Sequence, residues 1–360
     1  MATGLSLWFH ASVMPPNHDS MSLLVAASRM LAGGRYYSEI LDVNPPLILI
    51  VLSPAVGLAR FFSIGIELAV LLWVEALLVS SVVLARPHLR RLFGLDDVQG
   101  WILALAILIG LSAVAGDFGQ RDHLIVAFAI PAVSWYIARE LDGAGRSRVP
   151  WPPVALASLG FLLKPHSLVI PVFLILASAV RARSWRPLLD PCLMVFGVVA
   201  AAYGAMLVLF FPDYAKVVML AVDLYSYFGV APHILIYRIL PMLSVMAFLL
   251  VIFETLETEE RSRSIARFLG GLSAAGFLAL VLQGKGFSYH YLPGIFATMA
   301  LTGFAAARLV RGWRRRLSRP AVLALSAALL IPVLSVAGSY ASAVVYQPRS
   351  RILGLEFFQA

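Results

Sequence analysis

Long apolar runs decide what this chain can fold into. The stretch IELAVLLWVEALLVSSVVLA (66–85) and the stretch WILALAILIGLSAVAG (101–116) carry almost no charge. Runs of this length and composition are typical of helices that cross a bilayer. The whole chain agrees, because 13% of its residues are charged, whereas soluble domains carry about 25%. The sequence therefore predicts an all-α protein, a polytopic membrane helix bundle.

The positive charges are concentrated in five short loops between the apolar runs. They hold 18 of the 28 lysines and arginines, and they are RPHLRR (86–91), RELDGAGRSR (139–148), RARSWR (181–186), ETLETEERSRSIAR (254–267) and RLVRGWRRRLSR (308–319). Arginine-rich loops of membrane proteins face the cytoplasm. The net charge of +9 is thus explained by topology and by contact with anionic lipid headgroups. It does not indicate a nucleic-acid partner.

About ten transmembrane helices follow from this placement of the loops. They are expected at 66–86, 98–116, 122–138, 152–163, 166–180, 188–211, 232–253, 266–283, 288–308 and 320–345. The fourth and fifth are too short for a full span, which predicts a broken pair of helices that meet at KPH (164–166). Such a break is stable in a membrane only where it lines a protein cavity or water.

The first 65 residues are expected on the outer face of the membrane. The segment SMSLLVAASRML (20–31) carries its apolar side chains on one stripe, which predicts an amphipathic interfacial helix. The segment 45–62 is apolar enough to span, but its three prolines weaken it as a spanning helix. We interpret it as a second juxtamembrane helix. Three parts result: the outer-face loop with its juxtamembrane helices (1–65), a membrane module (66–211) and C-terminal transmembrane helices (212–360).

Histidines and lysines collect on the face opposite the arginine-rich loops. Six of the seven histidines and all three lysines fall there. Because positive charge in membrane proteins favours the cytoplasmic side, this distribution indicates a site on the outer face. Its segments are NHDS (17–20), YYSEILDVNPP (36–46), GDFGQRDH (116–123), KPH (164–166) and QGKGFSYHYLP (283–293).

Carboxylates beside lysines and histidines at a membrane boundary suit chemistry on a lipid-linked phosphate. A carboxylate can take a proton from an acceptor hydroxyl or amine, and cationic side chains can stabilise a leaving phosphate. Simpler interpretations stay open. Asp19 and Asp122 fit helix N-caps, Lys164 can extend to the headgroups, and Tyr289 fits an interfacial aromatic belt. Glu75, in the middle of an apolar run, is either functional or held by a structural hydrogen bond.

Three stretches resemble a known family. NHDSMSLLVAASRMLAGGRYYSEILDVNPPL (17–47), GDFGQRDHL (116–124) and GFLLKPHSL (160–168) are similar to motifs of the GT-C superfamily of membrane glycosyltransferases. The closest likeness is to the protein-mannosyltransferase and aminoarabinose-transferase-like branch, over about the first 210 residues. The resemblance implies a polyprenyl-phosphate sugar donor, juxtamembrane helices in the first outer loop, and a GT-C-like catalytic module at 66–211.

The resemblance also implies roles for particular residues. Asp19 resembles the first-loop catalytic aspartate, Asp122 or else Asp117 resembles the second-loop acid, and Lys164 resembles a basic residue that meets the donor phosphate. We expect further substrate-binding residues close to these positions or on the same face, and they are Asp42, Asp117, Arg121, His123, His166, Lys285 and His290.

The resulting expectation is an inverting glycosyltransferase in the membrane, in a bacterial cell the cytoplasmic (inner) membrane. It moves a sugar from a polyprenyl-phosphate donor to a lipid, glycan or protein acceptor on the external or periplasmic face. No cofactor is required, although Mg²⁺ or Mn²⁺ would suit the carboxylates. One alternative is a transporter or flippase of a lipid-linked sugar, but the internal repeats frequent in transporters are not visible.

A non-catalytic membrane subunit is the other alternative. Many relatives have a second acid after the first aspartate, where this chain has Ser20. Relatives also have a spanning helix before that aspartate, whereas residues 1–18 are too short and too interrupted to cross. Either the start of the chain is truncated or this member lacks that helix, and in both cases a form without activity is the expectation under this alternative.

Overall fold

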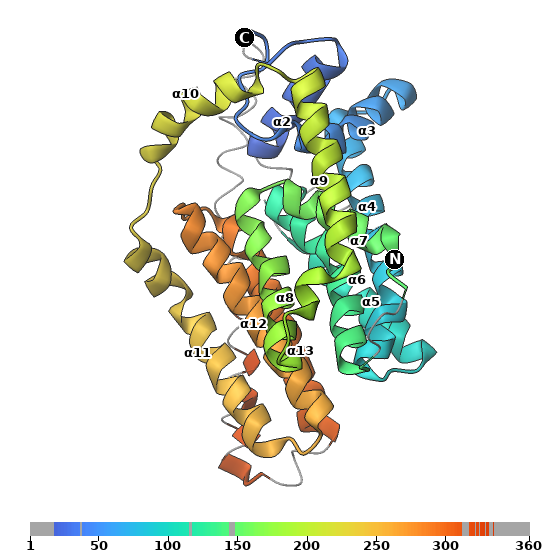
Figure 1. Cartoon of the computed structure of the whole chain (residues 1–360), viewed down its shortest axis with the longest axis vertical. Coiled ribbons are helices and arrows are strands. Elements are labelled where there is room, and N and C mark those ends of the chain that lie inside the picture. The colour runs from blue at the N-terminus through green and yellow to red at the C-terminus, as the bar shows by residue number, and fades with distance from the viewer. Residues whose placement is uncertain are drawn as a thin grey trace.

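The computed structural model consists of helices and their connections (Figure 1). It describes residues 18–36, 38–114, 117–143, 148–311, 317–320 and single positions between 322 and 334, with the backbone alone at 221–226 and 311. The helices are α2 (His18–Leu31), α3 (Pro46–Phe62), α4 (Ile66–Phe93), α5 (Asp97–Ser112), α6 (Arg121–Leu141), α7 (Trp151–Leu162), α8 (Val169–Ala182), α9 (Pro191–Phe210), α10 (Tyr214–Ser226), α11 (Pro232–Leu256), α12 (Glu260–Gln283) and α13 (Leu292–Arg311), with the 3₁₀ turns η1 (Pro165–Leu168), η2 (Arg186–Leu189) and η3 (Ser288–Tyr291). The described residues form no strand, and the all-α prediction is confirmed.

Seven helical segments are long and apolar enough to cross a membrane. They are Ile66–Phe93, Arg121–Leu141, Pro165–Ala182, Pro191–Phe210, Pro232–Leu256, Glu260–Gln283 and Ser288–Val310. The expected count of about ten is not confirmed, because α5 and α7 have 16 and 12 residues. At 1.5 Å per residue they reach about 24 Å and about 18 Å, less than the roughly 30 Å hydrocarbon core. The last expected helix, 320–345, lies largely outside the described residues.

The broken helix pair forms at KPH, as its sequence predicts. α7 ends at Leu162, and η1 and α8 continue from Pro165. Lys164 between them has an extended backbone (φ −147°, ψ 119°), the conformation that a following proline favours. The Ser167 hydroxyl donates to the carbonyls of Phe161 (3.0 Å) and Lys164 (2.7 Å). These bonds satisfy backbone groups that the break would otherwise leave open.

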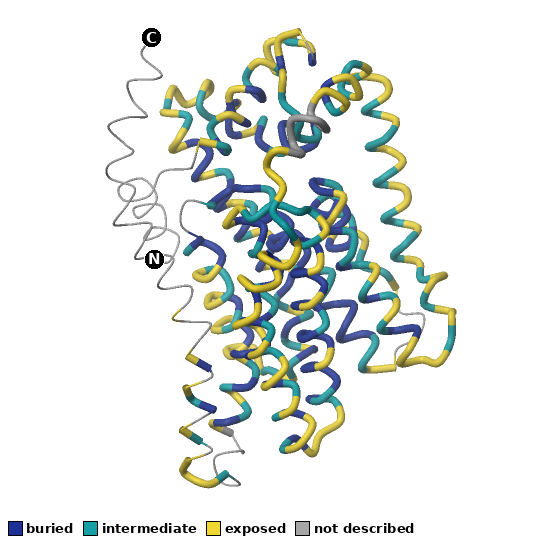
Figure 2. Tube along the Cα trace, turned by 90° about the vertical axis from the view of Figure 1, so that its left-hand side faces the viewer, coloured by how far each residue is buried: buried dark blue, intermediate teal, exposed yellow. Residues whose placement is uncertain are grey.

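Close contacts between helices build the interior of the bundle. A Cβ atom at Gly276 in α12 would lie 2.5 Å from the backbone nitrogen of Gly294 in α13, so only glycine fits between these helices. α6 is buried along most of its length, between α4 and α7. α9 has no buried residue and lies at the periphery. Figure 2 shows the same gradient, with buried segments inside and exposed ones outside.

Three shorter elements cover the upper end of the bundle (Figure 1). α2 and α3, expected as juxtamembrane helices, pack on each other, and the Trp73 indole in α4 donates to the Val51 carbonyl in α3 at 2.7 Å. α10 was not expected, since residues 212–231 were interpreted as a loop. It extends across the upper end from α9 towards α11 (Figure 1), and its Tyr214 hydroxyl donates to the Val43 carbonyl at 3.4 Å.

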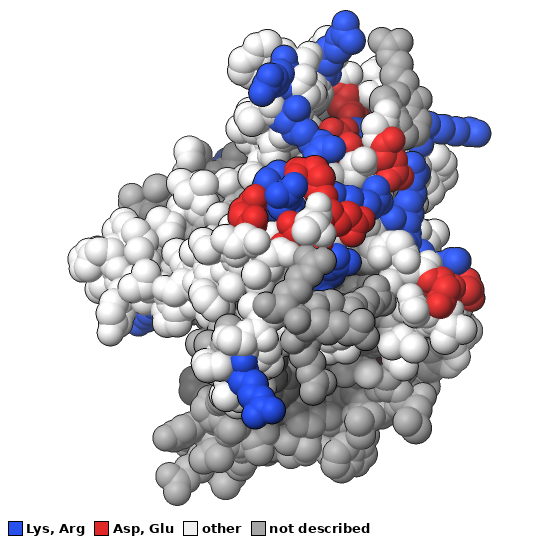
Figure 3. Space-filling model, turned by 90° about the horizontal axis from the view of Figure 1, so that it is seen from below, with Lys and Arg blue, Asp and Glu red and all other residues white. Residues whose placement is uncertain are grey.

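The five arginine-rich loops meet at the lower end of the bundle. We call this end the arginine face, and it comprises residues 86–97, 139–142, 148, 181–190, 254–267 and 308. Seen from below, it presents positive and negative side chains next to one another (Figure 3). Contacts between loops join Arg91 and Arg261 to Asp142, Arg139 to Asp190, Arg181 to Ser264, and Arg308 to Glu257. The arginine-rich loops therefore lie on one face, as expected. The cytoplasmic orientation of that face stays a prediction.

Candidate functional site

Charged and aromatic side chains from five segments come together at the other end of the bundle. We call them the polar cluster, and its members are Asp19, Asp42, Asp117, Arg121, Asp122, Lys164, Lys285, Tyr289 and His290. Arg121 begins α6, whereas Arg139 of the arginine face lies in its last turn. The polar cluster and the arginine face are therefore at opposite ends of the same helix.

A buried ion pair forms the centre of the polar cluster. The Lys164 ammonium donates to the Asp122 carboxylate, and the two residues are only 4% and 5% exposed. Burial lowers the pKa of Lys164 to about 8, while Asp122 opposes that shift. The ammonium also lies 4.9 Å from the centre of the Tyr289 ring, a cation–π contact. Lys164 therefore does not extend to the headgroups, and two of its three N–H donors stay available beyond its bond to Asp122.

Asp122 is held by its position in α6. The N-cap of α6 is Gln120, so Asp122 occupies the first turn of the helix and is not its cap. The exposed N–H groups and the dipole of a helix N-terminus favour a negative charge there. This local preference and Lys164 together keep a carboxylate stable inside the bundle.

Three further carboxylates surround the ion pair. Partial burial raises the pKa of Asp117 to about 6, and Asp122 and Asp19 add to this shift, although the Ser288 hydroxyl donates to Asp117 at 3.0 Å and opposes it. Burial also raises the pKa of Asp42, and the nearby Asp19 adds to this shift. The Asn44 N–H, which donates to Asp42 at 2.7 Å, and the Arg121 guanidinium oppose it. Carboxylates that raise one another's pKa are characteristic of sites that bind or move protons.

Segment 284–291 contributes Lys285, Tyr289 and His290 to the polar cluster. Burial lowers the pKa of Lys285 to about 8, and the nearby Arg121 adds to the shift. Tyr289 is buried, and its hydroxyl lies near the Asp19 carboxylate. Tyr289 therefore connects the aspartate of α2 with the Lys164 ammonium. The aromatic-belt interpretation of Tyr289 is wrong, because the 3₁₀ turn η3 directs its ring into the protein.

Two buried histidines have opposite hydrogen-bonding roles. His290 Nδ1 lies 3.1 Å from the Lys285 carbonyl, so it carries the proton and its Nε2 is an acceptor. His123 Nδ1 accepts from the Gly119 N–H at 3.0 Å, so its own proton sits on Nε2. His123 is fully buried beside Phe118. It fixes the loop before α6, and its expected contact with substrate stays a prediction.

A small pocket opens beside the ion pair. Its enclosed volume is about 10 Å³, roughly the space that one water molecule needs. The residues that line it are Asp122, Lys164, His166, Ser167, Ala279, Leu280, Gln283, His290 and Pro293. At this size the pocket admits a water molecule, and it would have to widen to take a larger group such as a phosphate.

The predicted site residues fall into three groups. Asp122, Lys164, His166 and His290 line the pocket; Asp19, Asp42, Asp117, Arg121 and Lys285 surround it; His123 supports the loop before α6. Sequence reasoning assigned Tyr289 to an interfacial belt and did not name Ser288 or Gln283 as site residues. The first two adjoin His290 in FSYHY, and that proximity was the one available signal.

Two other predictions concern metal and an intramembrane acid. Within the described ranges, no group of three or more histidine, cysteine or acidic side chains is placed to hold a metal ion. The Mg²⁺ or Mn²⁺ expectation stays a prediction. Glu75 is buried in α4 and accepts from the Ser112 hydroxyl at 3.1 Å. That contact agrees with a structural hydrogen bond.

Comparison with protein-family models, with curated proteins and with solved structures finds no match to this chain. The functional argument therefore rests on the chain's own residues and on the motifs quoted above.

Proposed function

We propose that this chain is a membrane glycosyltransferase of the GT-C type that uses a polyprenyl-phosphate sugar. The observation that carries the proposal is the pocket at the α7–η1 break, where a buried ammonium and two histidines adjoin a group of carboxylates. Cations suit the phosphate of a donor, and carboxylates suit the proton of an acceptor. The seven apolar helices are compatible with an integral membrane protein, which supports a lipid-linked donor.

In the proposed reaction the donor phosphate occupies the pocket. Lys164 has N–H groups left after its bond to Asp122, and the exposed His166 and the nearby Lys285 add positive or donor groups. The pocket, which has room for about one water molecule, widens to take the phosphate, while the sugar and the polyprenyl chain remain outside it. Charge that develops on the leaving phosphate is thereby stabilised in a largely dehydrated place, where electrostatic interactions are strong.

Asp19 is the proposed base. Its side chain is 41% exposed, so an acceptor arriving from the aqueous side can contact it, and the Tyr289 hydroxyl lies nearby. The acceptor oxygen attacks the anomeric carbon, the bond from that carbon to the phosphate oxygen breaks, and the phosphate leaves with the electron pair. The acceptor's proton passes to the Asp19 carboxylate. This single displacement inverts the anomeric centre, as the family resemblance implies.

The remaining parts of the proposal concern location and partners. The site faces the external or periplasmic side of a bacterial inner membrane, because the arginine face lies at the opposite end of the bundle. The acceptor is a lipid, glycan or protein that bears a hydroxyl or amine. Mg²⁺ or Mn²⁺ is not required by this mechanism.

A transfer assay in detergent with a synthetic polyprenyl-phosphate sugar and candidate acceptors tests the proposal. Wild-type protein should form the glycosylated acceptor. His166→Gln, at an exposed pocket position, should weaken donor binding while the fold survives. Movement of the donor across a vesicle membrane without transfer would instead identify a transporter, and neither activity would leave a non-catalytic subunit. Either result overturns the proposal.

A further inference from the structure

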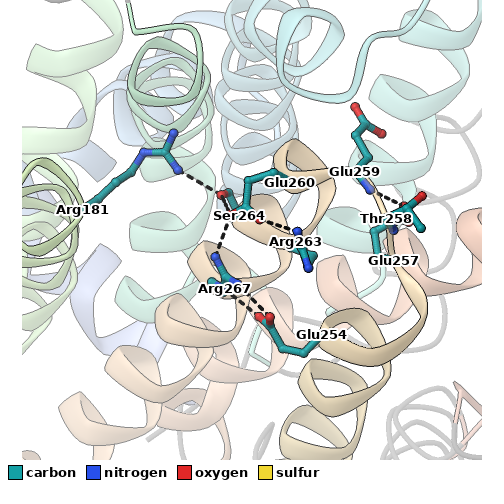
Figure 4. Close-up of polar contacts among 9 residues, drawn as sticks. All are labelled: Arg181, Glu254, Glu257, Thr258, Glu259, Glu260, Arg263, Ser264 and Arg267. Atoms are coloured by element: carbon teal, nitrogen blue, oxygen red, sulfur yellow. Dashed lines mark hydrogen bonds and ion pairs between the residues drawn. The ribbon is translucent and has the colours of Figure 1, made fainter.

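Most arginines of the arginine face are neutralised by carboxylates of the same face. Asp97 binds two of them, Asp142 binds two, and α11 and α12 supply glutamates for others. Figure 4 shows that part, where Arg267 lies between Glu254 and Glu260, and Arg181 reaches the Ser264 hydroxyl. Paired charges of this kind hold helix ends together and attract few external ions.

The loop between α8 and α9 differs from this pattern. Arg183 and Arg186 are exposed, and no carboxylate among the described residues lies within ion-pair distance of either guanidinium. Trp185 between them is 73% exposed, and Leu189 is 85% exposed. The loop thus presents two unneutralised cations together with an aromatic and an aliphatic side chain.

Backbone and capping bonds hold this loop in a defined shape. Arg183 ends α8 in the left-handed region (φ 47°), and the Ser184 N–H returns to the Ala179 carbonyl. Asp190 caps α9 by accepting from the Cys192 N–H, and it is itself bound by Arg139. The exposed side chains are therefore carried by an anchored turn.

The neighbouring helices fix where this turn lies relative to a membrane. α8, with η1, and α9 are both candidate spans, and α9 has no buried residue. The turn lies where both helices leave the apolar zone, which is the depth of lipid headgroups. Tryptophan is enriched at that depth, and an arginine guanidinium binds phosphate oxygens in a bidentate manner.

We propose that residues 183–189 form a binding site for anionic phospholipid headgroups. Arg183 and Arg186 contact the phosphates, while Trp185 and the two leucines, Leu188 and Leu189, enter the boundary of the acyl chains. The site is independent of the proposed transferase chemistry, because it lies at the opposite end of the bundle from the polar cluster.

The test measures thermal unfolding of the full chain in detergent, with added phosphatidylglycerol or phosphatidylcholine. The double variant Arg183→Gln/Arg186→Gln is compared with Arg148→Gln/Arg319→Gln, which removes the same charge from two other exposed arginines. Phosphatidylglycerol should raise the unfolding midpoint of wild type and of the control pair more than phosphatidylcholine does. The Arg183/Arg186 variant should lose most of that difference while keeping its midpoint without lipid.

Three results would overturn the proposal. The first is an equal response to both lipids in wild type, and the second is an unchanged phosphatidylglycerol effect in the Arg183/Arg186 variant. The third is an equal loss in both double variants, which would mean a general effect of net charge. Size-exclusion chromatography adds a check, since a change from dimer to monomer in the Arg183/Arg186 variant would assign the surface to a second copy of the chain.

Discussion

At the lower end of the bundle Asp142 accepts hydrogen bonds from Arg91 and Arg261, and these bonds outweigh burial and lower its pKa. At the upper end the pKa of Asp117 moves the other way, to about 6, because burial and the neighbouring carboxylates outweigh the Ser288 hydroxyl. The pKa values of two aspartates, one at each end of the bundle, are thus shifted in opposite directions. Charges of the arginine face stabilise one another, whereas the carboxylates of the polar cluster disfavour one another's ionisation.

The same contrast appears in how lysine and arginine side chains pair with carboxylates. Arginines of the arginine face bind carboxylates on exposed or half-buried surfaces. Lys164 pairs with Asp122 inside the protein, where the loss of hydration is costly and the pair contributes little net stability. A costly buried pair beside a pocket is expected where binding or catalysis has kept it. Under the proposed function, the charges of the arginine face are structural and those of the polar cluster take part in binding and catalysis. Each of the following variants tests this contrast.

The largest expected effect on stability is that of Lys164→Ala. The substitution leaves the Asp122 carboxylate buried without its partner, which costs about 3–5 kcal/mol. Denaturant unfolding should show this loss at neutral pH. The matched double variant Lys164→Met/Asp122→Leu, which removes both charges, should recover most of the stability. If the single variant is as stable as wild type, the pair is not buried as described.

A smaller, pH-dependent effect is expected for Asp117→Asn. The folded-state pKa of about 6 lies above the ordinary value of 3.8, so the folded chain binds this proton more tightly than the unfolded chain. The resulting stability is present below the ordinary pKa and is lost as the pH rises through 6. Asparagine avoids that loss. The unfolding midpoint of the variant should exceed that of wild type at pH 8, and the excess should shrink towards pH 4.

A difference that is constant between pH 4 and pH 8 would contradict the assignment to Asp117 ionisation. Asp142→Asn provides the opposite case. The pKa of Asp142 is lowered, so ionised Asp142 contributes stability at pH 8, and that contribution is lost as the pH falls through its folded-state pKa.

The smallest effect is expected for Arg261→Gln on the arginine face. Its guanidinium is partly exposed and binds Asp142 at 2.5 Å, while Arg91 also binds the same carboxylate. A partly exposed pair of this kind contributes about 0–1 kcal/mol. Denaturant unfolding at low and high salt should therefore show little change. A loss as large as that of Lys164→Ala would remove the distinction between the two ends.

The sequence predicts the residues at the two ends of the helix bundle better than it predicts the lengths and number of the helices. Arginine-rich loops and Pro165 are local signals, and they located the arginine face and the helix break correctly. α5 fell short of a span because Ser112 ends the helix before the apolar run ends. α10 was missed because it crosses the upper end of the bundle and does not span it.

The sequence predicted most residues of the candidate site, but not which of them contact one another. Lys164 and His290 were predicted because lysines and histidines collect on one face of the bundle. Asp122 was predicted because it lies at the boundary of an apolar run. The buried position of Tyr289 depends on how η3 packs against Lys164, a contact across 125 positions of chain that no local pattern encodes. For the same reason Asp122 was interpreted as a possible cap, whereas Gln120 occupies that position.

The central claim is that chemistry takes place in the polar cluster, and a matched pair of variants in the sugar-transfer assay tests it most directly. Asp19→Asn keeps the shape of the side chain in the first turn of α2, where the structure places Asp19 rather than at the N-cap, but asparagine cannot accept a proton as a carboxylate does. Transfer should fall by about 10²–10⁴-fold while donor binding persists. Asp142→Asn, at the arginine face, should leave transfer close to wild type. Near-normal transfer by Asp19→Asn, in a protein whose wild type is active, would contradict the account.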